Sequence, residues 1–249
     1  MVESDILALP VTDEVVEKTM INTAKKFSYT YQTLMYSRTP IELLDNIYMG
    51  DVAKNALVAY LRAHTALPIT DYDEIRTDDF QTPDPGWDVM IGKSGIKLEV
   101  KSSIPPNRES GASLINLRDI KITASHNKGQ TWMLPEDMES DIHVQVYFYA
   151  IPYREGYDSF DELASDLKRD YRIIGRLINA SKYNHPFFLG WTTKKRIIKH
   201  LKTLPQEQRT WTFAWTSRIY WKSPIKDALN MPQLLRCLDI LKNKEDASE

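Results

Sequence analysis

Two carboxylates and a lysine between residues 85 and 101 have the types and the spacing of a hydrolytic site. Asp88 is followed, after ten intervening residues, by Glu99 and then by Lys101. Side chains alternate between the two faces of an extended strand, so Glu99 and Lys101 point the same way, while Leu98 and Val100 point into the core. A hairpin partner can bring Asp88 beside them. Two converging carboxylates repel one another unless a cation neutralises them, and oxygen ligands select a hard divalent ion, Mg²⁺ or Mn²⁺.

Such an ion can polarise a phosphodiester, lower the pKa of a bound water and stabilise the charge that develops on phosphoryl oxygens. The sequence leaves three roles open for Lys101: it orients the attacking water, deprotonates it, or stabilises the pentacovalent transition state. The competing interpretation of the same three residues is a cross-strand ion pair on a solvated face, a common arrangement that contributes little to stability.

The segments around these residues predict the hairpin that would position them. Residues 87–91 and 96–101 have the composition of strands, and the Gly-Lys-Ser-Gly sequence of residues 92–95 predicts the turn between them. Before the hairpin, residues 12–38 are predicted to be helical. A capping box of Thr39 and Glu42, with proline at the first helical position, opens a second helix that extends to about residue 61, with a break or kink near Gly50.

Strands and helices alternate after the hairpin. The predicted elements are a strand buried on both faces (142–151), a helix opened by a capping box at Ser159 (159–177), a strand (187–191), a helix capped by Thr192 or Thr193 (194–201), a strand (210–221) and a mostly helical tail from residue 224. This order predicts one α/β domain over residues 1–249, in which helices flank a mixed central sheet. Within it we distinguish an N-terminal helical segment (about 1–64), the catalytic hairpin (about 86–103) and a basic C-terminal half (about 160–249).

The net charge of −2 conceals an uneven distribution of charge. The first 90 residues are rich in acids, whereas residues 166–226 contain 14 lysines and arginines and three acids. A basic half suits a polyanion such as nucleic acid, because phosphate contacts supply most non-specific affinity. The basic residues at the start of the 194–201 helix are the predicted DNA-binding group: Lys194, Lys195, Arg196 and Lys199. The alternative for each of them is a solvated helix face.

At Gly86-Trp87-Asp88-Val89 and Leu98-Glu99-Val100-Lys101 the chain resembles the PD-(D/E)xK phosphodiesterases, the restriction-endonuclease-like superfamily. The resemblance extends over about residues 39–221. It implies an α-β-β-β-α-β core with a metal ion bound by Asp88, Glu99 and the main-chain carbonyl of Val100.

One departure from the family pattern lies in the helix before the hairpin. Many members place a glutamate there in a Gly-x-x-Ala-Glu pattern, whereas here Gly50-Asp51-Val52-Ala53 is followed by Lys54. Asp51 or Glu42 could supply the missing acid, or the site has no third carboxylate. The number of metal ions therefore stays open.

The resemblance implies a Mg²⁺-dependent deoxyribonuclease, with Mn²⁺ as a substitute, and a restriction enzyme in particular. Because one active site cuts one strand, cleavage of double-stranded DNA favours a homodimer. The alternatives are a repair or junction-resolving nuclease and a DNA-binding module that has kept the fold without the chemistry.

The rest of the sequence excludes other classes of site. A single cysteine, Cys237, excludes an intramolecular disulfide, and its apolar neighbours predict a buried position. The chain has no membrane span or signal peptide in its sequence, which favours the cytoplasm of a bacterial or phage-infected cell. The histidines lack zinc-ligand spacing, and His143 is predicted to be a hydrogen-bonded residue of the buried strand. Gln145 and Tyr149 have the spacing of a motif that some related exonucleases use, but packing explains them better on a buried strand.

Overall fold

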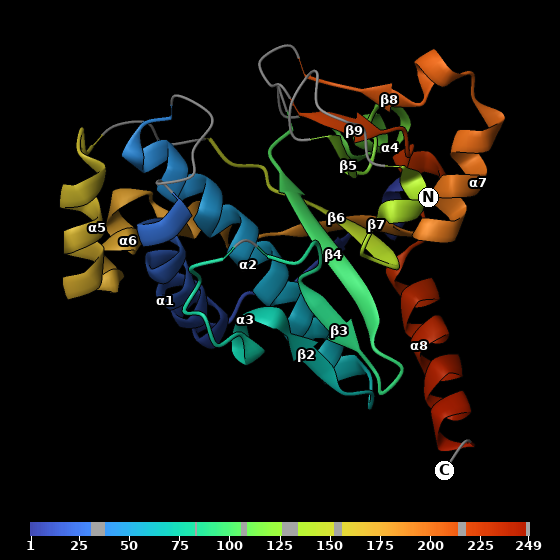
Figure 1. Ribbon diagram of the computed structural model, residues 1–249, viewed down its shortest axis with the longest axis horizontal. Helices are drawn as coiled ribbons and strands as arrows, with labels where there is room; N and C mark the ends of the chain where they lie inside the picture. Colours follow the sequence, from blue (N-terminus) through green and yellow to red (C-terminus); the bar gives the residue numbers. More distant parts are fainter. Residues whose placement is uncertain are drawn as a thin grey trace.

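A six-stranded mixed sheet forms the centre of the computed structural model (Figure 1). The structure describes residues 1–30, 38–82, 84–105, 109–125, 134–151, 156–213 and 218–247. In spatial order the strands of this sheet are β1 (Leu7–Ala8), β7 (Phe187–Thr193), β6 (Ile142–Tyr147), β4 (Ile96–Ser103), β3 (Val89–Ile91) and β2 (Ile69–Asp71). The α/β class with a mixed sheet flanked by helices is therefore as predicted.

The predicted hairpin is present as β3 and β4. The strands are antiparallel, with Val89 opposite Leu98 and Ile91 opposite Ile96. The turn requires its glycines, because Gly92 and Gly95 both have a φ near +70°, a conformation that side chains with a Cβ disfavour. Beyond the hairpin, β4 pairs in parallel with β6. All six residues of β6 are buried, as expected for a central strand. The predicted extension to residue 151 is wrong, because the strand ends at Tyr147, and Tyr149 and Ile151 are exposed.

Helices α1 (Asp13–Thr30) and α2 (Pro40–His64) cover one face of the sheet. The predicted capping box holds α2 at its start, since the Thr39 side chain accepts from the Glu42 main chain and the Glu42 carboxylate accepts from Thr39 N. The predicted break at Gly50 is wrong, because α2 continues through it. A glycine inside a helix costs about 1 kcal/mol, and burial of α2 along most of its length outweighs that cost. The predicted helix of residues 12–38 extends partly outside the described residues.

Three short or medium helices complete this side of the molecule. The predicted 159–177 helix is divided into α5 (Phe160–Arg169) and α6 (Ile174–Leu177), which pack near α1. Ser159 caps α5 as predicted, accepting from Glu162 N. Helix α3 (Tyr72–Ile75) follows β2 directly. The elements α2, β3, β4, β6, α5 and β7 follow one another in this order, with further helices and strands between them.

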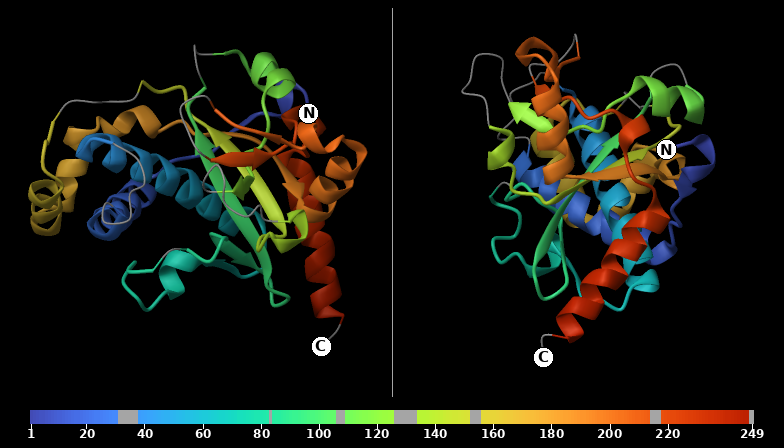
Figure 2. Two further views of the ribbon diagram at one scale, coloured as in Figure 1. Left: turned by 45° about the horizontal axis from the view of Figure 1, so that its top comes forward. Right: turned by 90° about the vertical axis from the view of Figure 1, so that its right-hand side faces the viewer.

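The opposite face of β4 and β6 is covered by a smaller sheet and two helices (Figure 2). These elements are β5 (Thr123–Ser125), β9 (Ile219–Trp221), β8 (Thr210–Trp211), α4 (Gly111–Leu117) and α7 (Lys194–Thr203). The prediction of one strand over residues 210–221 is wrong, because β8 and β9 are antiparallel partners and the chain reverses between them. The reversal stacks Trp211 on Tyr220, with ring centres 4.8 Å apart. Residues 214–217, including Trp215, lie outside the described residues.

Helix α8 (Met231–Asp246) leads to the C-terminus beside the β3–β4 turn, where the Glu245 carboxylate accepts from Ser94 N over 2.9 Å (Figure 1). Only one side of it is buried, through Met231, Leu234 and Leu238. The prediction of a buried Cys237 is wrong, because this residue lies on the exposed side of the helix. In the part of the chain that the structure describes, no helix is both long and apolar enough to cross a bilayer.

Candidate active site

Asp88, Glu99 and Lys101 meet at one cavity, on the face of the main sheet that the smaller sheet covers. The cavity has a volume of about 220 Å³. Its walls come from the hairpin, from the start of β6 and from the segments before and after them: Asp84, Gly86, Trp87, Asp88, Glu99, Lys101, Ile122, Thr123, Met138, Glu139, Ser140 and His143. The alternation predicted for β4 is present, since Leu98 is fully buried on the α2 side and both Glu99 and Lys101 line the cavity.

Asp88 stands immediately before β3 and is tied to β4 at two points. Its main-chain N donates to Leu98 O over 2.9 Å, and its Oδ2 accepts from Val100 N over 2.6 Å. Burial raises the pKa of the Asp88 carboxyl to about 6, against the opposing effects of the Lys101 charge and the Val100 hydrogen bond. Ionisation of Asp88 is therefore less favourable than that of an aspartate in solvent.

Glu99 is held from two sides. Lys101 Nζ lies 2.5 Å from Oε1, and His143 Nδ1 lies 3.0 Å from Oε2. Burial opposes ionisation of Glu99, but Lys101 and His143 outweigh it and hold its pKa at about 2. The Glu99 side chain is 14% exposed and that of Lys101 is 35% exposed, so the carboxylate end of this ion pair is shielded and the ammonium end is partly open to solvent.

The charge state of Lys101 narrows its chemical roles. Burial disfavours the ammonium, but the carboxylates of Glu99 and Asp88 outweigh burial and raise the pKa of Lys101. A lysine that stays protonated donates hydrogen bonds and cannot accept a proton from water. As an ammonium, Lys101 can orient a water or stabilise a charged phosphoryl oxygen.

His143 is a site residue whose role the sequence did not reveal. It lies directly opposite Glu99 in the parallel pairing of β6 with β4, and it is buried and hydrogen-bonded as predicted. Its Nε2 is buried and has no hydrogen-bond partner among the described residues, although the residue lines the cavity. The available signal was a histidine within a strand that has only one other polar side chain of this kind, Gln145.

The residues at the cavity fit a hard divalent ion with two carboxylates and one main-chain oxygen. The N–H and C=O of one strand residue point to the same edge, so the donation from Val100 N to Asp88 places the Val100 carbonyl on the Asp88 side of β4. Among the described residues no three His, Cys, Asp or Glu side chains are grouped as a metal site. The ligand set would therefore be Asp88, Glu99 and the Val100 carbonyl, completed by water or substrate.

Asp51, the candidate for a third acidic ligand, lies apart from this cavity. Its Oδ1 is 2.6 Å from Lys26 Nζ, and its Oδ2 accepts from Thr23 Oγ1 over 3.1 Å. Lys54, at the position where the family pattern has an acid, pairs with Asp71 and Asp73. Asp51 thus belongs to a buried ion-pair cluster between α1, α2 and β2. Glu42, the other candidate, caps the start of α2.

Two of the four predicted DNA-binding residues donate hydrogen bonds to main-chain oxygens of other segments. Lys194 Nζ donates to Met138 O over 2.7 Å, and Arg196 Nη2 donates to Asp227 O over 2.8 Å. Lys195 and Lys199 are exposed. Thr193 is the helix cap, since its hydroxyl accepts from Arg196 N.

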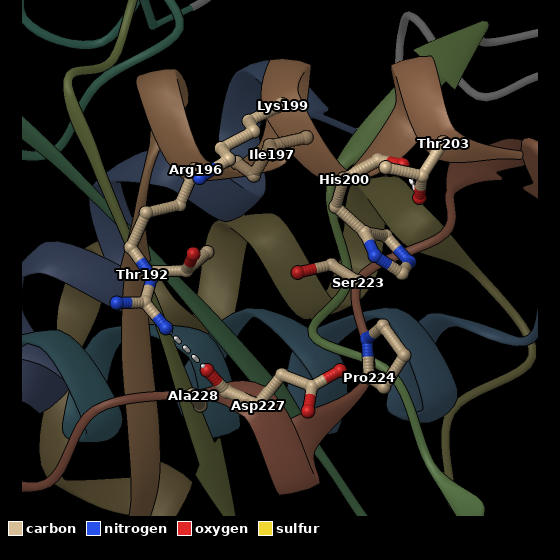
Figure 3. A pocket seen from close by; sticks show the side chains of 10 residues that line it. All are labelled: Thr192, Arg196, Ile197, Lys199, His200, Thr203, Ser223, Pro224, Asp227 and Ala228. Atoms are coloured by element: carbon tan, nitrogen blue, oxygen red, sulfur yellow. Dashed lines mark hydrogen bonds between the residues drawn. The ribbon is translucent and has the colours of Figure 1, made fainter.

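A second cavity of about 460 Å³ lies beside α7 (Figure 3). Arg196 and Lys199 line it from the helix, together with His200 and, from the segment before α8, Ser223 and Asp227. In Figure 3 the Ser223 hydroxyl points into the space between Arg196 and His200. The basic start of α7 therefore borders a concave surface.

A comparison of the chain with models of protein families, with curated proteins and with solved structures finds no match in any of the three.

Proposed function

We propose that the protein is a divalent-metal-dependent DNA endonuclease, and a restriction enzyme in particular. The observation that carries the proposal is the convergence of Asp88, Glu99 and Lys101 on one cavity beside the Val100 carbonyl. Two carboxylates and a main-chain oxygen are the ligands that Mg²⁺ prefers. A protonated lysine next to them suits a reaction in which negative charge increases on phosphoryl oxygens.

Four lining residues and one main-chain oxygen each have a definite part in this proposal. Mg²⁺, or Mn²⁺ in its place, would polarise the phosphodiester and make a bound water more acidic. Asp88, Glu99 and the Val100 carbonyl would hold the ion. The Lys101 ammonium would donate to a non-bridging phosphoryl oxygen or to the attacking water, and His143 would fix the orientation of Glu99. The reaction adds water across one P–O ester bond and yields a phosphate monoester and an alcohol.

The basic helix α7 supports DNA as the substrate. Lys195 and Lys199 are exposed and one turn apart, so both can contact phosphates on one side of a duplex. A double-strand break requires two such sites, which favours a homodimer. A restriction enzyme with this substrate would act in the cytoplasm, where DNA is exposed to it.

Incubation with plasmid DNA and Mg²⁺ tests the proposal directly. We expect discrete fragments from the wild type and no cleavage by Asp88→Asn, Glu99→Gln or Lys101→Ala. Each variant removes charge and little packing, so circular dichroism should show an unchanged fold. Lys168→Ala, an exposed lysine on α5, is the matched control and should cleave normally.

The outcomes separate the alternatives. Cleavage of four-way junctions or damaged duplexes, with plasmid left intact, would identify a repair or junction-resolving nuclease. DNA binding without cleavage of any of these substrates in Mg²⁺ or Mn²⁺ would identify a binding module. Full activity of Lys101→Ala would remove that residue from the mechanism.

A further inference from the structure

A buried side-chain amide joins the active strand to a second lysine. Gln145, on β6, is fully buried. Its Nε2 donates to the main-chain oxygen of Lys101 over 3.0 Å, and its Oε1 accepts from the main-chain N of Lys121 over 3.0 Å. One amide group therefore fixes the backbone of Lys121 against the strand that carries Glu99 and Lys101.

Lys121 lies at the entrance to the smaller sheet, just before β5. The next two residues, Ile122 and Thr123, line the candidate active site. The Lys121 side chain is half-buried, and its Nζ is 5.2 Å from the centre of the Phe213 ring. Phe213 in turn packs edge-to-face on Trp211, with ring centres 4.9 Å apart. The aromatic cluster of the smaller sheet thus limits where this ammonium can move.

The charges around Lys121 are of its own sign. In the described part of the chain no carboxylate forms an ion pair with Lys121, in contrast to Lys101, which pairs with Glu99. Burial, together with the charges of Lys101 and Arg218, lowers the pKa of Lys121 to about 8. A half-buried ammonium among charges of its own sign is unfavourable, so an anion that enters here would relieve that cost.

We propose that Lys121 is a second phosphate-binding cation of the active site, which contacts a phosphodiester of the nucleic acid while Gln145 holds its backbone against Lys101. This inference rests on the proposed nuclease function for the identity of the ligand. The scissile phosphate or its neighbour would then lie between Lys101, from the main sheet, and Lys121, from the smaller sheet. The two sheets would contribute one cation each, and the substrate would bridge them.

Binding of a labelled DNA duplex, measured with EDTA and again with Ca²⁺ at several salt concentrations, tests this role apart from cleavage. Lys121→Met keeps the length of the side chain and removes its charge. We expect it to weaken binding about three- to tenfold and to reduce the slope of log affinity against log salt by about 0.9, the contribution of one phosphate. Lys121→Arg restores the charge and should bind within about threefold of the wild type. Lys168→Met, a charge change at an exposed position on α5, should leave both quantities unchanged.

The results are decisive for Lys121 whether or not the protein cleaves DNA. An affinity and a salt slope in Lys121→Met equal to those of the wild type would overturn the inference, and so would a wild type that does not bind DNA. A loss in Lys121→Met that Lys121→Arg does not recover would show a packing role and overturn it as well. If the wild type binds through Lys121 but does not cleave in Mg²⁺ or Mn²⁺, the inference stands and the proposed endonuclease activity fails.

Discussion

His143 Nδ1 lies 3.0 Å from Glu99 Oε2, and the two residues are direct partners in the parallel pairing of β6 with β4. An ionised carboxylate only accepts hydrogen bonds, so Nδ1 must carry the hydrogen of this contact. The other ring nitrogen is then directed away from Glu99, without a partner among the described residues. Under the proposed function, this hydrogen bond would orient Glu99 as a ligating carboxylate.

Removal of this hydrogen bond should weaken metal binding. We expect His143→Leu to lower Mn²⁺ affinity about tenfold, because outer contacts of this kind are worth about 10- to 100-fold. His143→Asn can place an amide nitrogen near the position of Nδ1 and should recover much of the loss. Isothermal titration with Mn²⁺ measures both. Equal Mn²⁺ affinity in His143→Leu and the wild type would show that the hydrogen bond from His143 to Glu99 does not contribute to metal binding.

The buried position of Asp88 should make stability depend on pH in the absence of metal. Its pKa is raised to about 6 by burial, above that of an unfolded aspartate, so the folded state prefers the neutral acid. The stability that Asp88 contributes is therefore present at low pH and lost as pH rises from about 4 to 6. In EDTA we expect Asp88→Asn to be more stable than the wild type by about 1 to 2 kcal/mol at pH 7.5, with no gain at pH 4.

Urea denaturation at the two pH values measures this difference. A gain of the same size at both would show that packing, and not the charge of Asp88, causes it. Addition of Mn²⁺ at pH 7.5 should make the wild type more stable than Asp88→Asn, because the metal binds the ionised wild type and stabilises it.

Asp51 should contribute to stability and not to metal binding. Its carboxylate pairs with Lys26, which also lies 2.8 Å from Asp73. We expect Asp51→Asn to lower the free energy of unfolding by about 1 to 3 kcal/mol, since Lys26 keeps one of its two partners, and to leave Mn²⁺ affinity unchanged. Asp239→Asn, an exposed position on α8, is the control for loss of one negative charge. Weaker Mn²⁺ binding in Asp51→Asn, but not in Asp239→Asn, would show that Asp51 takes part in metal binding.

The exposed lysines of α7 should act through phosphate contacts. We expect Lys195→Ala with Lys199→Ala to weaken DNA binding about equally across sequences and to reduce the salt slope by about 1 to 2. The measurement uses Ca²⁺, so that binding is observed without cleavage. Lys242→Ala with Lys244→Ala makes the same change in net charge on α8. If the two double variants have the same slope, the basic face of α7 is only a solvated surface.

The hairpin and its three residues were predictable because their signals are local. Apolar alternation, a glycine turn and the 88–101 spacing all lie within one short segment, and β3 and β4 form as expected. The positions of His143 and Lys121 relative to these three residues were not predictable. The first reaches Glu99 through a parallel pairing across 44 positions of the chain, and the second reaches Lys101 through a side-chain amide on a third segment.

Two of the errors have the same origin. A buried helix tolerates Gly50, and Cys237 lies on the exposed side of α8, because segments distant in the sequence determine which helix face is covered. The reversal between β8 and β9 is different, because it pairs residues only 9 to 11 positions apart. The environment of the basic residues at the start of α7 was also not predictable from the sequence, because Lys194 and Arg196 bind main-chain carbonyls of distant segments.

The pairing of β4 with β6 has a consequence for the order in which the site assembles. Asp88 and Val100 meet within a hairpin, whose ends close over 12 residues, and such closures are fast. His143 and Gln145 arrive only when a parallel strand 44 residues away docks on β4, and long closures of this type are slow. During refolding we therefore expect two carboxylates to stand exposed on a nascent hairpin before their histidine and glutamine partners arrive. A divalent ion present at that stage could bind the hairpin first and serve as the template on which β6 docks.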